Sequence, residues 1–372
     1  MESFTCDCTE TEEPPLCVDL DGTLINTDLL MESLFSLLRH TPLTTLLVPF
    51  WLLRGKAYLK EQLVRRVQID VTVLPYHAEF LAYLRQLHTS GRRLVLATAS
   101  HLRFAEQVAT HLRIFESVLA TEAGRNLSRS RKGDCLANTY GERGFDYAGN
   151  SRADLAVWAR ARAAILVNPV PGVERKARAQ LPVTVVFDDR QGAWRVYLKA
   201  LRLPQWLKNL LIFVPLLVTH SYDDLTVMVQ AGLAFLTFGL CTSSVYLLND
   251  LLDLSIDRHH PHKRLRFFAA GTMSIIHGAI LVPSLLGAAL LIAVLLPLKY
   301  LAVLTGYLLT LLYSLRPRSI AMLKILGEAG LYTLRLIAGN ILVEMAISWP
   351  FLALSFCLFF GIILATRHAF DT

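Results

Sequence analysis

Three aspartates in the second half of the chain have the type and spacing to hold a cation. Asp250, Asp253 and Asp257 follow directly after an apolar run at residues 225–248. On a helix this spacing places all three carboxylates on one face, where they would repel one another unless a cation lay among them. A basic run suited to phosphate oxygens follows, with Lys263, Arg264 and Arg266. The pattern therefore predicts Mg²⁺ and a phosphorylated substrate at a membrane boundary.

A second set of polar residues stands in the first half of the chain. Asp19 and Asp21 are separated by one residue and followed by Gly22, which permits a turn. A hydroxyl, a lysine and two further polar side chains come later in the order Thr98, Lys132, Asn150 and Asp154. A carboxylate can attack phosphorus only if a metal ion and a lysine offset the repulsion between the two anions. This set therefore predicts phosphoryl-transfer chemistry.

The strands and helices that must position the second set are typical of a parallel α/β sheet. Short β-branched runs alternate with helix-like segments, and the expected strands are residues 16–20, 93–99, 145–149, 164–168 and 183–187. Ligands of such sheets bind at the carboxyl ends of the strands. Most of the polar residues of the second set fall at those ends.

A helical insert at about residues 30–87 separates the first two expected strands and would form a cap. Within it, residues 42–53 are very apolar but too few to span a bilayer. We expect them to form the core of the cap. The alternative is an interfacial patch that rests on lipid or on the second domain.

The order of these features resembles the haloacid dehalogenase (HAD) phosphatase superfamily. The resemblance implies that Asp19 is the nucleophile and that Asp21 is the general acid and base. It also implies that Thr98 and Lys132 hold the phosphate, and that Asn150 and Asp154 complete a Mg²⁺ site with the two aspartates. The superfamily usually has Asp where this chain has Asn150, which lowers the negative charge at the metal.

Composition separates the two halves of the chain. Hydrophobic residues make up 53% of the 372 residues, and the formal net charge is +7. Apolar runs begin after Leu201 and occupy residues 210–218, 225–248, 275–296, 300–313, 331–343 and 351–365. If these are six spans, every strongly basic connection falls on one side, which the positive-inside rule makes cytoplasmic. We expect a multi-pass protein of the bacterial inner membrane, with the α/β domain in the cytoplasm.

We therefore divide the chain into four parts. They are a disordered N-terminus (residues 1–15), the α/β domain (16–190), a linker and membrane-entry segment (191–208) and an all-α polytopic membrane domain (209–372). The six cysteines form no paired CxxC grouping, so we expect free thiols in a reducing compartment. The acidic N-terminus lacks the basic start of a signal peptide. The basic runs lie at membrane boundaries, so a nucleic-acid partner is not expected.

The membrane half resembles the UbiA prenyltransferase superfamily, and within it the decaprenyl-phosphate phosphoribosyltransferase branch and members with an N-terminal HAD domain. The motifs that carry this resemblance are LPQWLKN at residues 203–209, NDxxDxxxDRxHPxKR at 249–264 and AAG at 269–271, extended by residues 313–314 and 330–339. The resemblance implies that Mg²⁺ on a diphosphate is held by Asn249, Asp250, Asp253 and Asp257. Phosphate contacts would be Lys208, Lys263, Arg264 and Arg266. Weaker candidates, which helix packing explains about as well, are Tyr313, Glu328, Tyr332 and Arg335.

The function that this resemblance implies is transfer of phosphoribose from phosphoribosyl pyrophosphate to polyprenyl phosphate. The fused HAD domain would then remove the 5-phosphate from the lipid-linked product. Two alternatives stay open, an aromatic prenyltransferase that uses prenyl diphosphate and an inactive membrane-anchored relative. The inactive relative is favoured by Lys324, which stands where the family usually has Asp. It is also favoured by the length of the sequence, which ends soon after the sixth of about nine expected helices.

Overall fold

The computed structural model describes residues 13–122, 124, 126–189, 193–314, 321–344 and 348–371. The chain forms two compact units. The first consists of Met1–Gln191 together with Leu252–Ile276, and the second of Gly192–Leu251 together with His277–Thr372. The N-terminal segment expected to be disordered lies almost entirely outside the described residues.

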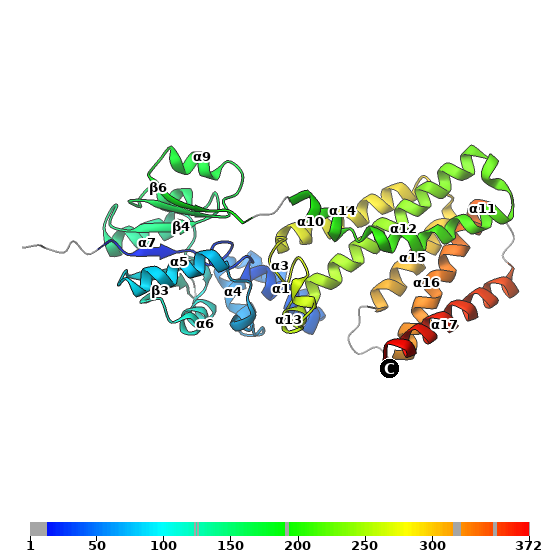
Figure 1. Ribbon diagram of the computed structural model, residues 1–372, viewed down its shortest axis with the longest axis horizontal. Helices are drawn as coiled ribbons and strands as arrows, with labels where there is room; N and C mark the ends of the chain where they lie inside the picture. The colour runs from blue at the N-terminus through cyan, green and yellow to red at the C-terminus, as the bar shows by residue number, and fades with distance from the viewer. Residues whose placement is uncertain are drawn as a thin grey trace, which may run out of the picture. The chain divides into compact units, whose positions relative to one another are not determined.

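The first unit is built on a six-stranded parallel sheet with the strand order β3-β2-β1-β4-β5-β6 (Figure 1). The strands are β1 (Leu16–Val18), β2 (Leu94–His101), β3 (Ser117–Thr121), β4 (Asp146–Gly149), β5 (Ala164–Val167) and β6 (Val183–Phe187). The α/β prediction is confirmed. The sequence did not predict β3, an edge strand whose residues are mostly half-buried and whose short run resembles its neighbouring loops.

Alternation along the strands builds a hydrophobic core on each face of the sheet. Leu16 and Val18 point to one face and pack with α5 (Ala78–Thr89) and α6 (Leu102–Leu112). Cys17 points to the other face. That face is covered by α7 (Ser130–Tyr140), α8 (Leu155–Trp158) and α9 (Val173–Arg178). A parallel sheet covered on both faces leaves its strand ends as the place for polar side chains.

The cap consists of short helices with their own small core. These are α1 (Leu29–His40), α2 (Pro42–Thr45), α3 (Val48–Leu53) and α4 (Lys56–Val64), followed by the 3₁₀ turn η1 (Val71–Val73). Leu37, Trp51, Leu59 and Leu63 form the cluster. The predicted cap includes α5, which packs in the core cluster of the sheet, and the bounds of the cap stay a prediction. The prediction that residues 42–53 are cap core is wrong, because most of their large side chains are exposed.

A segment from the second half of the sequence completes the first unit. Residues 252–276 contain α13 (Leu254–His259) and the 3₁₀ turn η4 (Lys263–Leu265). Arg258 is buried and forms two hydrogen bonds with Glu32 of α1, at 2.9 and 2.6 Å. The predicted division of the chain at residues 190 and 209 did not assign residues 252–276 to the first unit.

The second unit is helical. Its elements are α10 (Ala193–Ala200), the 3₁₀ helix η2 (Leu203–Phe213), α11 (Val214–Val218), η3 (Ser221–Asp223), α12 (Leu225–Leu252), α14 (Ile275–Ala293), α15 (Leu298–Ser314), α16 (Ala321–Leu342) and α17 (Trp349–Asp371). Helices α15, α16 and α17 pack in succession (Figure 1). Phe238, Tyr300 and Tyr307 lie at the centre of the core.

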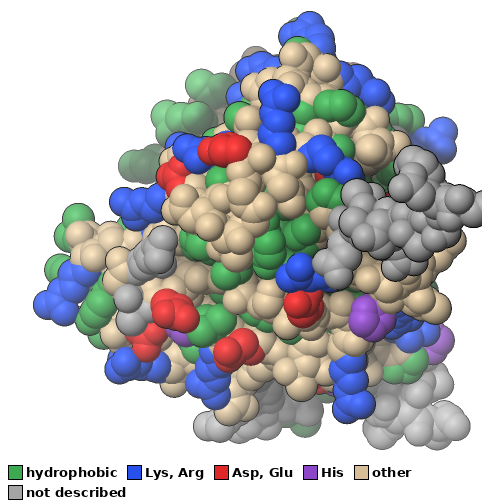
Figure 2. Space-filling view, turned by 90° about the vertical axis from the view of Figure 1, so that its left-hand side faces the viewer, with side chains coloured by type: hydrophobic (Ala, Val, Ile, Leu, Met, Phe, Trp, Pro, Cys, Tyr) green, Lys and Arg blue, Asp and Glu red, His purple; other side chains and the backbone are tan. Residues whose placement is uncertain are grey.

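Three described helices are long and apolar enough to cross a membrane: Leu225–Leu252, Ile275–Ala293 and Trp349–Thr366. A fourth span results if Trp194–Ala200 and Leu203–Val218, which are bent by 46°, are taken together. Six predicted apolar runs thus correspond to helical segments, and the number that span the bilayer stays a prediction. Figure 2 shows a face of a different composition from these apolar helices. Basic, acidic and apolar side chains are mixed on it, as they are on a surface that faces water.

Candidate active sites

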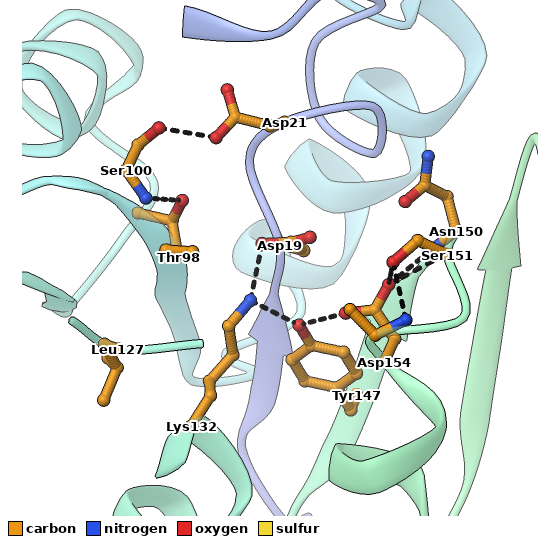
Figure 3. Close-up of polar contacts among 12 residues, drawn as sticks. Asp19, Asp21, Thr98, Ser100, Leu127, Lys132, Tyr147, Asn150, Ser151 and Asp154 are labelled. Atoms are coloured by element: carbon orange, nitrogen blue, oxygen red, sulfur yellow. Dashed lines mark hydrogen bonds and ion pairs between the residues drawn. The ribbon is translucent and has the colours of Figure 1, made fainter. Parts of the chain in front are cut away.

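The HAD-like site is centred on a buried lysine at the carboxyl end of β1. Lys132, near the start of α7, donates hydrogen bonds to Asp19 Oδ1 at 2.7 Å and to Tyr147 Oη at 2.9 Å (Figure 3). Asp19 and Lys132 are both buried. A buried carboxylate needs such a partner, since an unpaired charge away from water is very costly. The structure therefore brings the predicted nucleophile and the predicted phosphate-binding lysine together.

Electrostatics at this site follow from burial and pairing. Burial raises the pKa of Asp19 to about 6, although the Lys132 ammonium lowers it. Burial alone would lower the pKa of Lys132, but attraction to Asp19 and Asp154 outweighs it, so that pKa is raised. Lysine therefore stays charged at neutral pH, and Asp19 is ionised and able to act as a nucleophile.

Asp21 occupies a different environment, one that suits a proton donor. Its Oδ1 accepts a hydrogen bond from the Leu29 backbone N–H at 2.9 Å, and its Oδ2 accepts one from Ser100 Oγ at 2.5 Å. Burial, followed by repulsion from Asp28, raises the pKa of Asp21 to about 7. Asp21 thus accepts hydrogen bonds from neutral donors, whereas Asp19 accepts one from the Lys132 ammonium, and this difference suits the predicted roles of general acid and nucleophile.

The loop after β4 places Asn150 and Asp154 in unequal positions. Asp154 accepts hydrogen bonds from Ser151 N–H at 2.8 Å, Ser151 Oγ at 2.7 Å and Tyr147 Oη at 3.0 Å. Its carboxylate therefore organises the loop. Asn150 lies over the turn of the first motif, because a Cβ on Gly22 would meet Asn150 Nδ2 at 2.4 Å. Gly22 has φ +75°, so glycine suits this position on two grounds.

Oxygen donors at this strand end have the chemistry that Mg²⁺ prefers, with carboxylates from Asp19 and Asp21 and the amide of Asn150. Among the described residues, no group of three or more His, Cys, Asp or Glu side chains could hold a metal ion. Asn150 would contribute a neutral amide oxygen in place of a third carboxylate. The magnesium site therefore stays a prediction that these residues fit.

Three residues of this site were not predicted from the sequence. Ser100 bonds Asp21, and Tyr147 links Lys132 to Asp154. Lys60 of α4 donates to the Ala99 carbonyl at 2.5 Å and to Asn126 Oδ1 at 2.8 Å. A small cavity lined by Leu29, Lys60, Ser100 and Phe104, among others, lies beside it. Only Ser100, which follows Thr98 by two positions on the same strand, could have been inferred from spacing. Thr98 itself is buried, and its Oγ1 accepts from the Ser100 N–H at 2.9 Å.

Each aspartate of the transferase motif has an arginine partner within its own unit. In the second unit, Arg202 donates to both oxygens of Asp250, at 2.8 and 2.6 Å. In the first unit, Arg39 forms an ion pair with Asp253, and Arg266 donates to Asp257 at 2.8 Å. These carboxylates suit a cation, and the arginines suit phosphate oxygens. Neither Arg39 nor Arg202 was predicted from the sequence.

The other predicted transferase residues lie as follows. Asn249 is near the end of α12, and Lys263 and Arg264 are exposed on η4. Lys208 Nζ lies 5.7 Å from the centre of the Tyr332 ring, and Tyr332 stacks on Phe359. Arg335 is buried and donates to Asn209 Oδ1 and Tyr307 Oη, each at 2.8 Å. Tyr313 lies on α15 and Glu328 on α16, while the Lys324 side chain is outside the described residues.

Two family models match the chain. Residues 16–157 match the haloacid dehalogenase-like hydrolases, and residues 209–371 match the UbiA prenyltransferase family. The chain is 36% identical over 371 residues to the protein y4nM of Sinorhizobium fredii, covering 99% of this chain and 71% of that protein.

Two further relatives match about half of their own length. The nodulation protein NoeC of Azorhizobium caulinodans is 34% identical over 43% of this chain and 52% of its own. The decaprenyl-phosphate phosphoribosyltransferase of Mycobacterium tuberculosis is 33% identical over 42% of this chain and 54% of its own. A probable phosphoserine phosphatase structure from Vibrio cholerae covers 45% of this chain and 60% of its own, at 19% identity and a TM-score of 0.35. Because that score is low, we base the fold on the sheet order and on the family match.

Proposed function

The chain belongs to the UbiA prenyltransferase family and carries a haloacid dehalogenase-like hydrolase domain, and from this premise we propose a two-step membrane enzyme. In the first step, phosphoribose passes from phosphoribosyl pyrophosphate to a polyprenyl phosphate. In the second, the HAD-like domain removes the 5-phosphate from the lipid-linked product. The observation that carries the second step is the buried Asp19–Lys132 pair, and the aspartate motif with its arginines supports the first.

In the hydrolytic step, Asp19 attacks phosphorus and forms an aspartyl phosphate. Lys132 offsets the charge of the phosphoryl oxygens, and Asp21 donates a proton to the departing ribose oxygen. Asp21 then accepts a proton from the water that hydrolyses the aspartyl phosphate, which returns Asp19. Magnesium held by Asp19, Asp21, Asn150 and Asp154 would neutralise phosphate charge in this step, and magnesium held by the aspartate motif would neutralise the charge of the diphosphate.

The transferase substrates are supported by the named relative. The match to a decaprenyl-phosphate phosphoribosyltransferase covers 173 residues. In the proposed reaction, an oxygen of the lipid phosphate bonds to the anomeric carbon of ribose as the bond to pyrophosphate breaks. Arg266 and the exposed Lys263 and Arg264, which all belong to the first unit, are the proposed contacts for the departing pyrophosphate. We place the enzyme in the bacterial inner membrane with its first unit in the cytoplasm, on the side of the basic connections.

The test uses the full chain in lipid nanodiscs with Mg²⁺ and polyprenyl phosphate. Transfer of label from phosphoribosyl pyrophosphate that is lost in Asp250→Asn/Asp253→Asn supports the first step. Transfer from labelled prenyl diphosphate to an aromatic acceptor would replace it with the prenyltransferase alternative. For the second step, lipid-linked phosphoribose should release inorganic phosphate, and Asp19→Asn should abolish the release. No turnover of any phosphorylated lipid would refute the hydrolytic role.

A further inference from the structure

An apolar surface on the cap has no partner within the described residues. We call Pro42–Leu53, which comprises α2 and α3, the docking segment. Leu43, Phe50 and Leu53 are 82%, 65% and 85% exposed, and Leu46, Leu47 and Leu52 are exposed as well. So many large apolar side chains in one short stretch cannot be explained as scattered surface residues. Their exposure points to a surface that is covered in the working protein.

The docking segment is held in shape from within. Trp51 is buried in the cap cluster, and the Arg66 guanidinium lies 4.8 Å from the centre of its ring. The Thr41 N–H donates to the Leu37 carbonyl at 2.8 Å, which ends α1 at the point where the segment begins. Trp51 thus anchors the segment, with Val48 half-buried beside it, while most of its large apolar neighbours are exposed. This arrangement presents an apolar surface without requiring it for the fold of the cap.

The connections and the flanking residues of the docking segment indicate that a lipid bilayer covers it. The first unit includes residues 252–276, which join α12 to α14. Both helices are long and apolar enough to cross a membrane, so the first unit is held at the membrane surface through two covalent connections. Exposed basic residues flank the docking segment, with His40 before it and Arg54 and Lys56 after it. Apolar side chains bordered by basic ones match the boundary between acyl chains and anionic headgroups.

We propose that the docking segment inserts into the interface of the membrane that the chain itself spans. At twelve residues it is too short to cross the bilayer, and it would lie in the plane of the headgroups. It would hold the cap, and with it the site at Asp19, at the depth where a lipid-linked phosphate is presented. That last consequence rests on the proposed function, whereas the docking itself does not.

The first test measures depth directly on the full chain in nanodiscs that contain anionic lipid. A nitroxide label is attached at Phe50→Cys or, as a control, at Gln86→Cys on the exposed face of α5, in a chain whose native cysteines are serine. We expect the Phe50 label to favour oxygen over a water-soluble nickel chelate several-fold more than the Gln86 label does. Equal accessibility at both sites would overturn the proposal. A Phe50 label shielded from both reagents would also overturn it and would indicate contact with protein instead.

The second test separates docking from folding. The variant Leu43→Ser/Phe50→Ser/Leu53→Ser changes only exposed side chains, and Val170→Ser is the matched control in the same unit. We expect kcat/KM for a lipid-linked phosphate in the nanodisc to fall several-fold, while kcat/KM for a soluble aryl phosphate is unchanged. An equal loss on both substrates, or no loss on either, would overturn the proposal. If the unmodified chain hydrolyses no lipid-linked phosphate, the proposed function fails, and the label experiment still decides the docking.

Discussion

Arg258 allows a sharp test of whether residues 252–276 are part of the HAD-like unit. Its guanidinium forms two hydrogen bonds with Glu32 and donates a third to the Ala269 carbonyl at 3.2 Å. Glu32 also accepts from Thr27 Oγ1 at 2.5 Å, and the Thr27 carbonyl accepts from the Gly22 N–H of the first HAD motif at 3.1 Å. The pair therefore connects a transferase-motif residue to the loop that bears Asp19 and Asp21.

Replacing Arg258 with Met should leave the Glu32 carboxylate buried without its cation. Removing one partner of a buried ion pair costs about 3–5 kcal/mol, which is on the order of 100-fold or more in an opening equilibrium. In the full chain in nanodiscs, hydrogen exchange of peptides that cover residues 22–40 and 252–276 should therefore accelerate about 100-fold or more. The double variant Glu32→Leu/Arg258→Met removes both charges and should recover most of the protection.

Arg178 provides the matched control, because it pairs with Glu174 one helical turn away and both side chains are about half exposed. Such pairs contribute roughly 0–1 kcal/mol, so Arg178→Met should change exchange by no more than about fivefold. The reasoning is refuted if Arg258→Met behaves like Arg178→Met. It is also refuted if the double variant exchanges as fast as Arg258→Met, since the loss would then not come from an unpaired charge.

Three further predictions concern the HAD-like site. Lys132→Met should reduce phosphatase kcat about 100-fold or more and move the acid limb of the pH–rate profile upward from about 6. The reason is that Asp19 must be ionised and would lose the cation that lowers its pKa. The exposed Lys176→Met is the control, and a Lys132→Met profile like that of the control would contradict this prediction. Asn150→Asp should strengthen Mg²⁺ activation about 30-fold, since a unit negative charge about 4 Å from a divalent ion contributes about 2 kcal/mol even in water. The exposed Asn138→Asp should not strengthen it. Equal activation constants for Asn150→Asp and the unchanged chain would refute the metal role. Burial raises the pKa of Cys17 to about 12, so iodoacetamide at pH 8 should alkylate the partly exposed Cys135 and spare Cys17 until the unit unfolds, as peptide mass spectrometry would report.

The parts of the first unit that sequence predicted are those with strong local signals. Short β-branched runs indicated five of the six strands, and polar residues after them indicated Asp19, Asp21 and Asp154. Lys132 was predicted in a basic loop and lies on α7. Tyr147 was missed because the sequence of a strand does not show which side chain a residue will contact in the folded protein, whereas the spacing of Ser100 from Thr98 could have indicated Ser100. The docking segment was predicted to be core because its residues are apolar. Whether an apolar side chain is buried depends on the elements that pack over it, which the composition of the segment does not show.

The membership of residues 252–276 in the first unit could not have been predicted from composition. In the sequence, Arg258 is one residue of a basic run at a membrane boundary, and Glu32 is a polar residue near the start of a helix. Their contact joins positions 226 residues apart, which no local spacing encodes. Predicted domain limits followed the change in hydropathy along the chain. The compact units instead follow tertiary contacts, which return to the first unit after α12.

The arginine partners change how the aspartate motif should be understood. From the sequence, Asp250, Asp253 and Asp257 form an acidic cluster that needs a cation for charge balance. In the folded chain each carboxylate already has an arginine, and two of these arginines, Arg39 and Arg202, come from before the motif in the sequence. Each carboxylate is thus balanced within its own unit, Asp250 in the second and Asp253 and Asp257 in the first. Because Arg39 belongs to the cap and Asp253 to the transferase motif, the cap of the HAD-like domain supplies one of these balancing charges.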